Sequence, residues 1–244
     1  MQNSAHDGLF FGAHGPEGWA LPPEEWKHAL KVLRLPVGSS IRVCDGKGKG
    51  ALCSIAEGEA LEWLEDLAPL PKPNLPLHMA VGMLQKADRF EWMVEKLAEL
   101  GVEKLYPLLT ERSPYSRIKM HRLEKIAQSA MKQSGRFTRM EVAEPMQLEA
   151  CLRVAPPGIW RLAYCKEQAP KLDWPKEASP QHAVAVGFIG PEGDFTAKEV
   201  EMLQAHHAEM MPLGAARLRT ETAALLMTAK WMQAQGLDQE AMQQ

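Results

Sequence analysis

The sequence predicts an α/β protein in two parts, a small β-rich module followed by a larger domain with a mostly parallel sheet. From residue 77 onward, strand-like apolar runs alternate with helical patterns, an order typical of a parallel sheet with helices on both faces. Upstream, short runs of period two predict a small barrel-like or mixed β module. The proline-rich stretch "APLPKPNLP" lies between them and favours an extended spacer. We therefore expect domains at 1–68 and 77–244, joined by a linker at 69–76.

The first module is predicted from three β-like segments and one helical segment. The β-like segments are "SIRVC", "GALCSIAE" and "ALEWLEDL", and turn glycines in "DGKGKG" separate the first two. One segment, "PEEWKHALKVLRL", has apolar residues at Trp26, Leu30 and Leu33. That spacing predicts a helix packed on the strands.

The larger domain begins with the strand "LHMAVGML" and continues with "KLYPLL", "MEV", "WRLAY", "HAVAVGFI" and "AEMMPL". Between them, "DRFEWMVEKLAELG" predicts a helix that Asp88 caps, with Glu91 completing a capping box and Gly101 ending the helix. A second helix is predicted at "MHRLEKIAQSAMKQSG". A third, "TAKEVEMLQAHH", opens with a capping box from Thr196 to Glu199. The last is "ETAALLMTAKWMQAQG".

Composition excludes several classes of protein. The net charge of -3 argues against a chain that is basic throughout. No apolar run is long enough to cross a membrane, and the N-terminus lacks the basic start and apolar core of a secretory signal. Four cysteines occur without a Cys-x-x-Cys pair, which favours free thiols in a reducing cytosol over a zinc site. We expect a cytoplasmic protein without a metal; the cysteines are Cys44, Cys53, Cys151 and Cys165.

The segment "GFIGPEGDF" joins the strongest predicted strand to a helix through Gly190 and Gly193. Its Gly-x-x-Gly spacing is neither the dinucleotide fingerprint nor a Walker A loop. Glycines leave the backbone bare, so a ligand can approach closely and find exposed amide donors. A tight turn with nothing bound is an equally good interpretation of this loop alone.

A second glycine segment, "LGAARLRTETAAL", also follows a predicted strand and precedes a helix. Thr220 and Glu221 are typical of a helix cap and first turn. A cap does not account for Arg217 and Arg219, which lie between the glycine and the helix. Two such loops at adjacent strand ends predict a single ligand cleft, because open α/β sheets bind ligands at the carboxyl ends of their strands.

The stretch from residue 112 to 139 is strongly basic, with Glu124 as its single acid. A solvated helix surface usually mixes both signs of charge. The excess therefore predicts a nucleic-acid partner that is held through its phosphates. The basic residues are Arg112, Arg117, Lys119, Arg122, Lys125, Lys132, Arg136 and Arg139.

Together, "IGPEGDF" and "LGAARLRTETA" resemble the paired motifs of RsmE-type 16S rRNA uridine-N3 methyltransferases, a family of the SPOUT superfamily. Upstream, "HALKVLRLPVGSSIRVCDGKGKG" is similar to that family's N-terminal PUA-like RNA-binding domain, and "QKADRFEWMVEKLAELGVEKLYPLLTERS" to its segments before the cofactor site. The chain departs from the family in having Asp194 after Gly193, where a second glycine is usual. The family's Leu-Gly-Pro-Arg is replaced by the run from Leu213 to Arg217, which displaces the arginine by one position or loses it.

The resemblance implies a C-terminal SPOUT domain with a deep trefoil knot, an N-terminal PUA-like β-barrel and a homodimer. It also implies S-adenosylmethionine as cofactor and the 16S rRNA of the small ribosomal subunit as substrate. The cofactor is expected near the two glycine loops and the strand end before residue 165. The expected cofactor residues are Tyr164, Cys165, Ile189, Gly190, Pro191, Glu192, Gly193, Leu213, Gly214, Leu218, Thr220 and Thr222.

In such an enzyme, Arg219 is our candidate for stabilising the negative charge that develops on the uracil oxygens. Glu221 is the second catalytic candidate, although it also suits a helix cap, and the proton acceptor is open between Glu221, Glu192 and water. RNA is expected over the N-terminal module and the basic stretch. The RNA-binding candidates are Arg34, Arg112, Arg117, Lys119, Arg122, Arg136 and Arg139.

Two alternatives remain open from the sequence. One keeps the fold and cofactor but changes the target, for example to a ribose 2′-hydroxyl or another RNA position. The other is a non-catalytic RNA-binding factor of ribosome assembly whose altered loops no longer hold the cofactor. Nucleoside analysis of the product separates the first alternative, and a cofactor titration separates the second.

Overall fold

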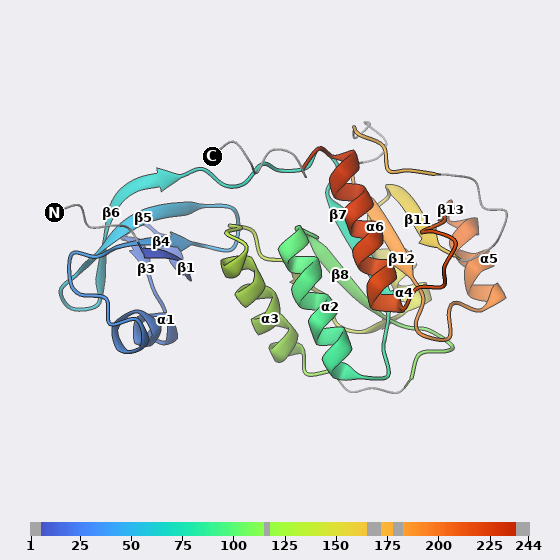
Figure 1. The fold of residues 1–244 in the computed structure, drawn as a ribbon, viewed down its shortest axis with the longest axis horizontal. Helices are drawn as coiled ribbons and strands as arrows, with labels where there is room; N and C mark the ends of the chain where they lie inside the picture. The colour runs from blue at the N-terminus through green and yellow to red at the C-terminus, as the bar shows by residue number, and fades with distance from the viewer. Residues whose placement is uncertain (1–5, 115–117, 165–171, 178–182, 238–244) are drawn as a thin grey trace. The chain divides into compact units, whose positions relative to one another are not determined.

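The computed structural model describes residues 6–114, 118–164, 172–177 and 183–237. It divides into two compact units (Figure 1). The first unit comprises Met1–Leu70 together with Gln128–Arg139, and the second comprises Pro71–Ala127 and Met140–Gln244. The end of the second predicted helix therefore groups with the N-terminal residues.

The first unit contains a four-stranded sheet, a two-stranded hairpin and a short helical segment. The sheet has the order β1-β4-β5-β6, in which β1 and β4 are parallel and the other pairs antiparallel. The hairpin strand β3 lies against β6. The predicted strands β4, β5 and β6 are present, whereas β1, β2 and β3 were not predicted. The strands are β1 His6–Phe11, β2 Ala13–Gly15, β3 Gly18–Ala20, β4 Ser40–Cys44, β5 Gly50–Ala56 and β6 Ala60–Leu67.

The single helix predicted before β4 is wrong in detail. It is a short α-helix, α1 (Pro23–Lys27), that continues into a π-helical turn, η1 (His28–Val32). Trp26 nevertheless packs into the core of the unit with Phe10 and Ile41. The wider π turn still keeps the predicted apolar face against the strands.

The segment that follows the long basic helix is hydrogen-bonded to the "DGKGKG" turn. The backbone N–H of Gly48 donates to the carbonyl of Phe137 over 2.9 Å, and that of Arg139 donates to Gly46 over 2.9 Å. A Cβ on Gly50 would come within 2.3 Å of the Phe137 ring. Gly50 therefore does more than allow a turn, because its missing side chain leaves the space that the ring fills.

The second unit is built on an all-parallel sheet, as the alternating pattern predicts. The strand order is β10-β8-β7-β12-β11-β13, with β9 beside β8. Strands β7, β8, β11, β12 and β13 agree with the predicted segments, and β10 was not predicted. The strands are β7 Leu77–Gly82, β8 Lys104–Leu109, β9 Glu141–Val142, β10 Met146–Gln147, β11 Ile159–Ala163, β12 Ala185–Ile189 and β13 Glu209–Met211.

Helices cover both faces of this sheet (Figure 1). On one face, Phe188 of β12 packs in a cluster with residues of α4 and α5, and burying a side chain of that size contributes about 1.5–3 kcal/mol. On the other, α6 packs against β7, β12 and α2. Gly187 lets α6 approach closely, because a Cβ there would lie 2.6 Å from the sulfur of Met227. The helices are α2 Ala87–Leu100, α3 Met120–Gln133, α4 Leu148–Val154, α5 Ala197–Ala205 and α6 Thr220–Ala234.

Two predicted N-caps are wrong and one is confirmed, and the predicted C-terminal cap of α2 at Gly101 is also confirmed. Helix α2 has Lys86 at its N-cap, and the Asp88 carboxylate instead accepts from the next backbone N–H, that of Arg89, over 2.9 Å. At α6 the N-cap is Arg219, so Thr220 is already the first helical residue. The capping box that opens α5 has both of its reciprocal hydrogen bonds, between Thr196 and Glu199.

Candidate functional site

Four parallel strands end at one edge of the second unit's sheet, and the candidate site is built there. The register pairs Val81 of β7 with Ile189 of β12, and Ala163 of β11 with Met211 of β13. Parallel strands share their carboxyl edge, where ligands bind in such sheets. The strands that carry the two glycine segments are not adjacent, contrary to prediction, because β11 lies between β12 and β13.

The first glycine loop, Gly190–Thr196, folds back on itself directly after β12. The backbone N–H of Asp194 donates to the carbonyl of Pro191 over 2.9 Å. Gly190 is required for this turn, because a Cβ there would lie 2.8 Å from the Asp194 carboxylate and 2.9 Å from the Phe195 nitrogen. The loop therefore keeps its backbone closely packed against itself at the strand end.

Asp194 takes a left-handed backbone conformation, with φ of 62°. Most side chains are unfavourable there, but aspartate is among the more tolerant because its short polar side chain can bond locally. Here the Asp194 carboxylate accepts the backbone N–H of Phe195 over 2.8 Å. Aspartate at this position is thus accommodated by a local hydrogen bond.

Gly82, the last residue of β7, lets the first glycine loop pack directly against the sheet. A Cβ on Gly82 would come within 2.4 Å of the nitrogen of Pro191. The far end of the loop is anchored as well: Phe195 is buried. The Glu199 carboxylate also accepts the backbone N–H of Glu111, in the segment after β8, over 2.9 Å. Both ends of the loop are therefore fixed to neighbouring strand ends.

Arg89, in the first turn of α2, joins the first glycine loop to the start of α6. Its Nη2 lies 2.6 Å from each carboxylate oxygen of Glu221, and its Nε donates to Oε1 over 3.0 Å. Its Nη1 reaches Oε1 of Glu192 at 3.5 Å. The hydrogen bonds and charge of Glu221, with a smaller effect from Glu192, raise the pKa of Arg89. Since its Glu221 partner is only 10% exposed, this ion pair is poorly screened by solvent.

Glu192 is further oriented by the segment after β7. Its Oε1 accepts the backbone N–H of Gln85 over 3.2 Å. Two more arginines bind carbonyls of the same loop: Arg112 Nη1 donates to Gly193 over 2.9 Å, and Arg217 Nη2 approaches the Glu192 carbonyl at 3.5 Å. Both loop carbonyls are thus directed at arginine guanidinium groups.

The second glycine loop, Leu213–Arg219, is far more open. Gly214 has φ of 134°, a conformation that favours glycine. Gly214, Arg217 and Arg219 are exposed, whereas Leu213 and Leu218 are half-buried. Among the described residues, no carboxylate lies within ion-pair distance of Arg219. Thr220 is buried in the first turn of α6 and Thr222 is exposed, so this loop presents a guanidinium at the site's edge.

Tyr164 directly follows β11 and is half-buried at the same edge of the sheet. Cys165, the other candidate at this strand end, lies outside the described residues. Ile189 and Pro191 are buried, and Gly193 is exposed. The described cofactor candidates therefore lie at one edge of the sheet. They come from the end of β11, the first glycine loop and the second glycine loop.

The basic candidates are divided between the two units. In the second unit, Arg112, Lys119 and Arg122 are exposed. In the first unit, Arg34 is exposed with φ of 55°, Arg139 is exposed, and burial lowers the pKa of Arg136. Arg117 lies outside the described residues. Lys132, also in the basic stretch, is ion-paired with the buried carboxylate of Glu25 inside the first unit.

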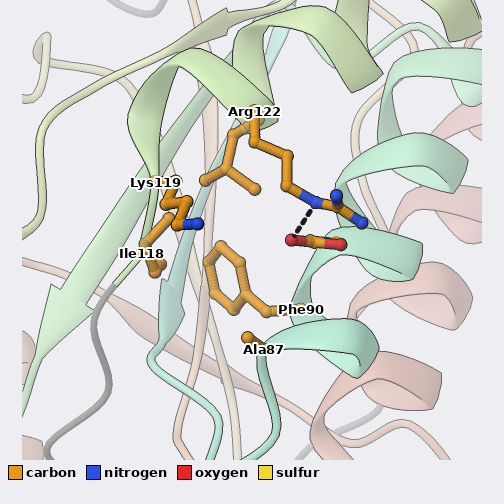
Figure 2. Close-up of a pocket in the computed structure, with 7 residues that line it drawn as sticks. Ala87, Phe90, Ile118, Lys119 and Arg122 are labelled. Carbon is orange, nitrogen blue, oxygen red and sulfur yellow. Dashed lines mark ion pairs between the residues drawn. The ribbon is translucent and has the colours of Figure 1, made fainter.

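A cavity of about 220 Å³ opens beside the first turn of α2 (Figure 2). One wall comes from α2 and the other from the start of α3 and the residues before it. Arg122 Nε binds the Glu91 carboxylate across the opening at 2.5 Å. Its lining includes Ala87, Phe90, Glu91, Ile118, Lys119 and Arg122.

Other expected features concern thiols, metals and membranes. Burial raises the pKa of Cys44 and Cys53 to about 11 and that of Cys151 to about 12, so these free thiols stay protonated at neutral pH. Within the described ranges, no group of three or more His, Cys, Asp or Glu side chains is placed to hold a metal ion. In the same ranges, no helix is long and apolar enough to span a bilayer.

Sequence reasoning missed Arg89 and Gly82 as site residues. Arg89 lies within a predicted helix, and its partner Glu221 is 132 positions away, so no local pattern links them. Gly82 did carry a signal, because an isolated glycine at the end of an apolar strand often marks the close approach of another backbone.

A family model described as an RNA methyltransferase domain matches residues 71–232. This chain therefore belongs to the RNA methyltransferase family, and the match covers the described core of the second unit.

Particular relatives carry more specific names. The chain is 31% identical over 200 residues to the ribosomal RNA small subunit methyltransferase E of Synechocystis, covering 79% of this chain and 65% of that protein. A probable rRNA methyltransferase of Porphyromonas gingivalis has 30% identity and a TM-score of 0.82, covering 95% of this chain and all of the other. The ribosomal RNA small subunit methyltransferase E of Neisseria gonorrhoeae, solved with bound S-adenosylmethionine, has 26% identity and a TM-score of 0.78, over 93% of this chain and 98% of that one.

Proposed function

We propose that this protein transfers a methyl group from S-adenosylmethionine to N3 of a uridine in small-subunit ribosomal RNA. The observation that carries the proposal is the position of Arg89, which binds both Glu221 at the start of α6 and Glu192 in the first glycine loop and so joins that loop to the helix that follows the second. The names of the Synechocystis and Neisseria relatives support the substrate, and the bound cofactor of the Neisseria enzyme supports the methyl donor.

The cofactor would be held by the first glycine loop and the neighbouring strand end. Gly193 leaves its backbone exposed to a ligand, whereas the buried Gly190 lets the loop fold back at the strand end. A cofactor that carries the reactive group leaves binding and orientation to the protein. Bound there, S-adenosylmethionine supplies an electrophilic methyl group. The residues proposed to hold it are Tyr164, Cys165, Ile189, Gly190, Pro191, Glu192, Gly193, Leu213, Gly214, Leu218, Thr220 and Thr222.

Arg219 is proposed to act on the RNA base. Uracil N3 must lose its proton before or during methyl transfer, which places negative charge on the ring oxygens. A guanidinium directed at those oxygens stabilises that charge. The exposed position of Arg219 at the N-cap of α6 supports this role, since its guanidinium is not committed to a carboxylate among the described residues.

Glu221 is better suited to positioning than to accepting the proton. Both of its oxygens are engaged by Arg89, so protonating the carboxylate would break an ion pair that holds the site together. The proton acceptor is therefore either Glu192, whose side chain is 34% exposed, or water.

The proposed RNA surface has two parts, each on its own unit. The second unit contributes Arg112, Lys119 and Arg122, and the first contributes Arg34, Arg136 and Arg139. We also propose that the first unit is a PUA-like RNA-binding domain, which is supported by the packing of β3 against β6. We assign the second unit to the SPOUT trefoil-knot class and expect a homodimer, which light scattering of the purified chain would detect.

The test is product analysis. Purified protein is incubated with labelled S-adenosylmethionine and small ribosomal subunits that lack the modification, and digested rRNA is analysed by mass spectrometry. The account predicts 3-methyluridine. A 2′-O-methylated nucleoside would overturn the choice of target atom. No methylated nucleoside, together with no cofactor binding in a titration, would instead leave an RNA-binding protein with a methyltransferase fold.

A further inference from the structure

The cavity beside α2 lies on the same edge of the sheet as the glycine loops but does not overlap the Arg89 ion pair. It is bounded by α2, which follows β7, and by Ile118, Lys119 and the first turn of α3. Ala87, Phe90 and Glu91 line it from one side of α2. The Arg89 side chain leaves the same helix toward Glu221 and Glu192. The cavity therefore flanks the proposed reaction site.

The lining combines an apolar floor with a cationic rim. Phe90, only 1% exposed, forms the floor together with Ala87 and Ile118 (Figure 2). At the rim, the Lys119 ammonium has no acidic partner within ion-pair distance among the described residues. Arg122 keeps its place there through its bond to Glu91. Apolar surface beside an uncompensated ammonium suits a ligand with a flat apolar body and a negative charge.

A nucleotide has that chemistry, and the small volume of the cavity suits its base, with the sugar and phosphate outside. At about 220 Å³, it is smaller than the roughly 300–1,000 Å³ typical of sites for drug-sized ligands. Proteins that hold single-stranded nucleic acid bind the bases on apolar or aromatic surfaces and the backbone through cations. The basic excess between residues 112 and 139 favours RNA over an acidic protein segment as the source of the charge.

We propose that this cavity receives an unstacked nucleotide of the RNA that flanks the methylated uridine, with its base against Ala87 and Ile118, above the buried Phe90, and its phosphate near Lys119. This inference rests on the proposed function. Uracil N3 lies on the Watson–Crick edge, so the target must be unpaired when it reacts, and enzymes of this kind act on single strands or on extruded bases. Holding a neighbouring nucleotide outside the stack would keep the strand open at the target.

The experiment separates filling the cavity from removing its charge. Ala87→Leu fills the cavity at an exposed first helical position and leaves every charge in place. Its matched control is Ala197→Leu, at the exposed first position of α5. Lys119→Gln removes the rim charge, with Lys198→Gln on α5 as its control. Each full-length variant is titrated with a fluorescent single-stranded RNA that carries the methylation site, at several salt concentrations, and its S-adenosylmethionine affinity is measured separately.

Ala87→Leu is expected to weaken RNA binding about 5- to 100-fold, with an unchanged salt slope and unchanged S-adenosylmethionine affinity. Lys119→Gln is expected to lower the salt slope by about one. If Ala87→Leu binds RNA as Ala197→Leu does, the inference is overturned. That outcome is distinct from failure of the proposed function, in which the wild-type protein produces no 3-methyluridine although the RNA titration can still be read.

Discussion

The two glycine loops look alike in sequence and differ in structure. The first glycine loop is fixed at both ends: Gly82 admits Pro191 onto the sheet, and Phe195 is buried ahead of the capping box. The second glycine loop is largely exposed, and Arg217 meets the first only at 3.5 Å. Both loops follow a strand and precede a helix, so the local pattern alone does not distinguish them.

This difference indicates that the two glycine loops have different roles. A loop whose backbone is held from several directions provides fixed donors for a cofactor, and such pre-organisation avoids reorganisation during the reaction. A loop that presents an uncommitted arginine is suited to a group that arrives with the RNA. Arg89 connects the two loops. It binds Glu221 at the start of α6, the helix that follows the second glycine loop, and Glu192 in the first glycine loop.

The largest expected effect comes from replacing Arg219 in the second glycine loop. Arg219→Ala should slow methyl transfer about 100- to 1,000-fold, as removing one donor to a developing oxyanion does in other enzymes. Single-turnover assays with saturating cofactor and RNA measure this step. Arg219→Lys should recover only part of the rate, because an ammonium cannot present two parallel donors. Full activity of Arg219→Ala would remove the second glycine loop from the chemistry.

Breaking the connection between the loops should have the next largest effect. Arg89→Gln leaves the Glu221 carboxylate, which is 10% exposed, without its partner. It should lower the free energy of unfolding by about 1–3 kcal/mol, less than for a fully buried pair, because Arg89 is itself 26% exposed. Urea unfolding measures the change. Lys96→Gln is the matched control on α2, because it removes only the pairs with Glu95 and Glu99. Equal stability of the two variants would contradict the role given to Arg89.

His78 lies near the start of β7, at the end of the sheet opposite the two glycine loops. Burial, with a smaller effect from Lys104, lowers the pKa of His78 to about 4 although Glu141 opposes the shift. Between that value and an unfolded pKa of about 6.5, the unfolded chain binds more protons. Stability should therefore fall as pH drops from about 6.5 to 4, by roughly 2–3 kcal/mol relative to His78→Phe. Unfolding curves of both proteins across this range measure it; parallel curves would place the pH dependence elsewhere.

Asp194 should give the smallest change. Asp194→Gly restores the family's residue at φ of 62° and removes one hydrogen bond to Phe195. These effects oppose each other, so stability should stay within about 1 kcal/mol of the wild type. Asp194→Ala loses the bond and keeps the backbone strain, so it should unfold at lower temperature than either. Calorimetry ranks the three, and an alanine variant as stable as the wild type would show that neither effect matters there.

Local signals predicted much of the fold. The predicted segments "ALEWLEDL" and "KLYPLL" have the same bounds as β6 and β8, and the capping box of α5 depends on side chains three positions apart. The cap proposed for α2 failed because Asp88 lies within the first turn and bonds its neighbour instead. The apolar pattern did not distinguish a π turn from an α-helix in η1, since Leu30 in the π turn still packs against the core of the first unit.

The site was predictable only in part. Glycine and arginine in two loops marked the edge where ligands bind, and the parallel sheet brought those loops to one side. The pairing of Arg89 with Glu221 depends on how α2 and α6 pack, which no short pattern records. The grouping of Gln128–Arg139 with the N-terminal residues likewise depends on Phe137 filling the space above Gly50.

The most direct test of the division between the loops is calorimetric titration of S-adenosylmethionine into three proteins: the wild type, Gly190→Ala and Arg219→Ala. We expect the wild type and Arg219→Ala to bind the cofactor alike. We also expect Gly190→Ala to lose binding, because a Cβ there would lie 2.8 Å from the Asp194 carboxylate. Binding that is lost with Arg219→Ala, or kept with Gly190→Ala, would contradict the account.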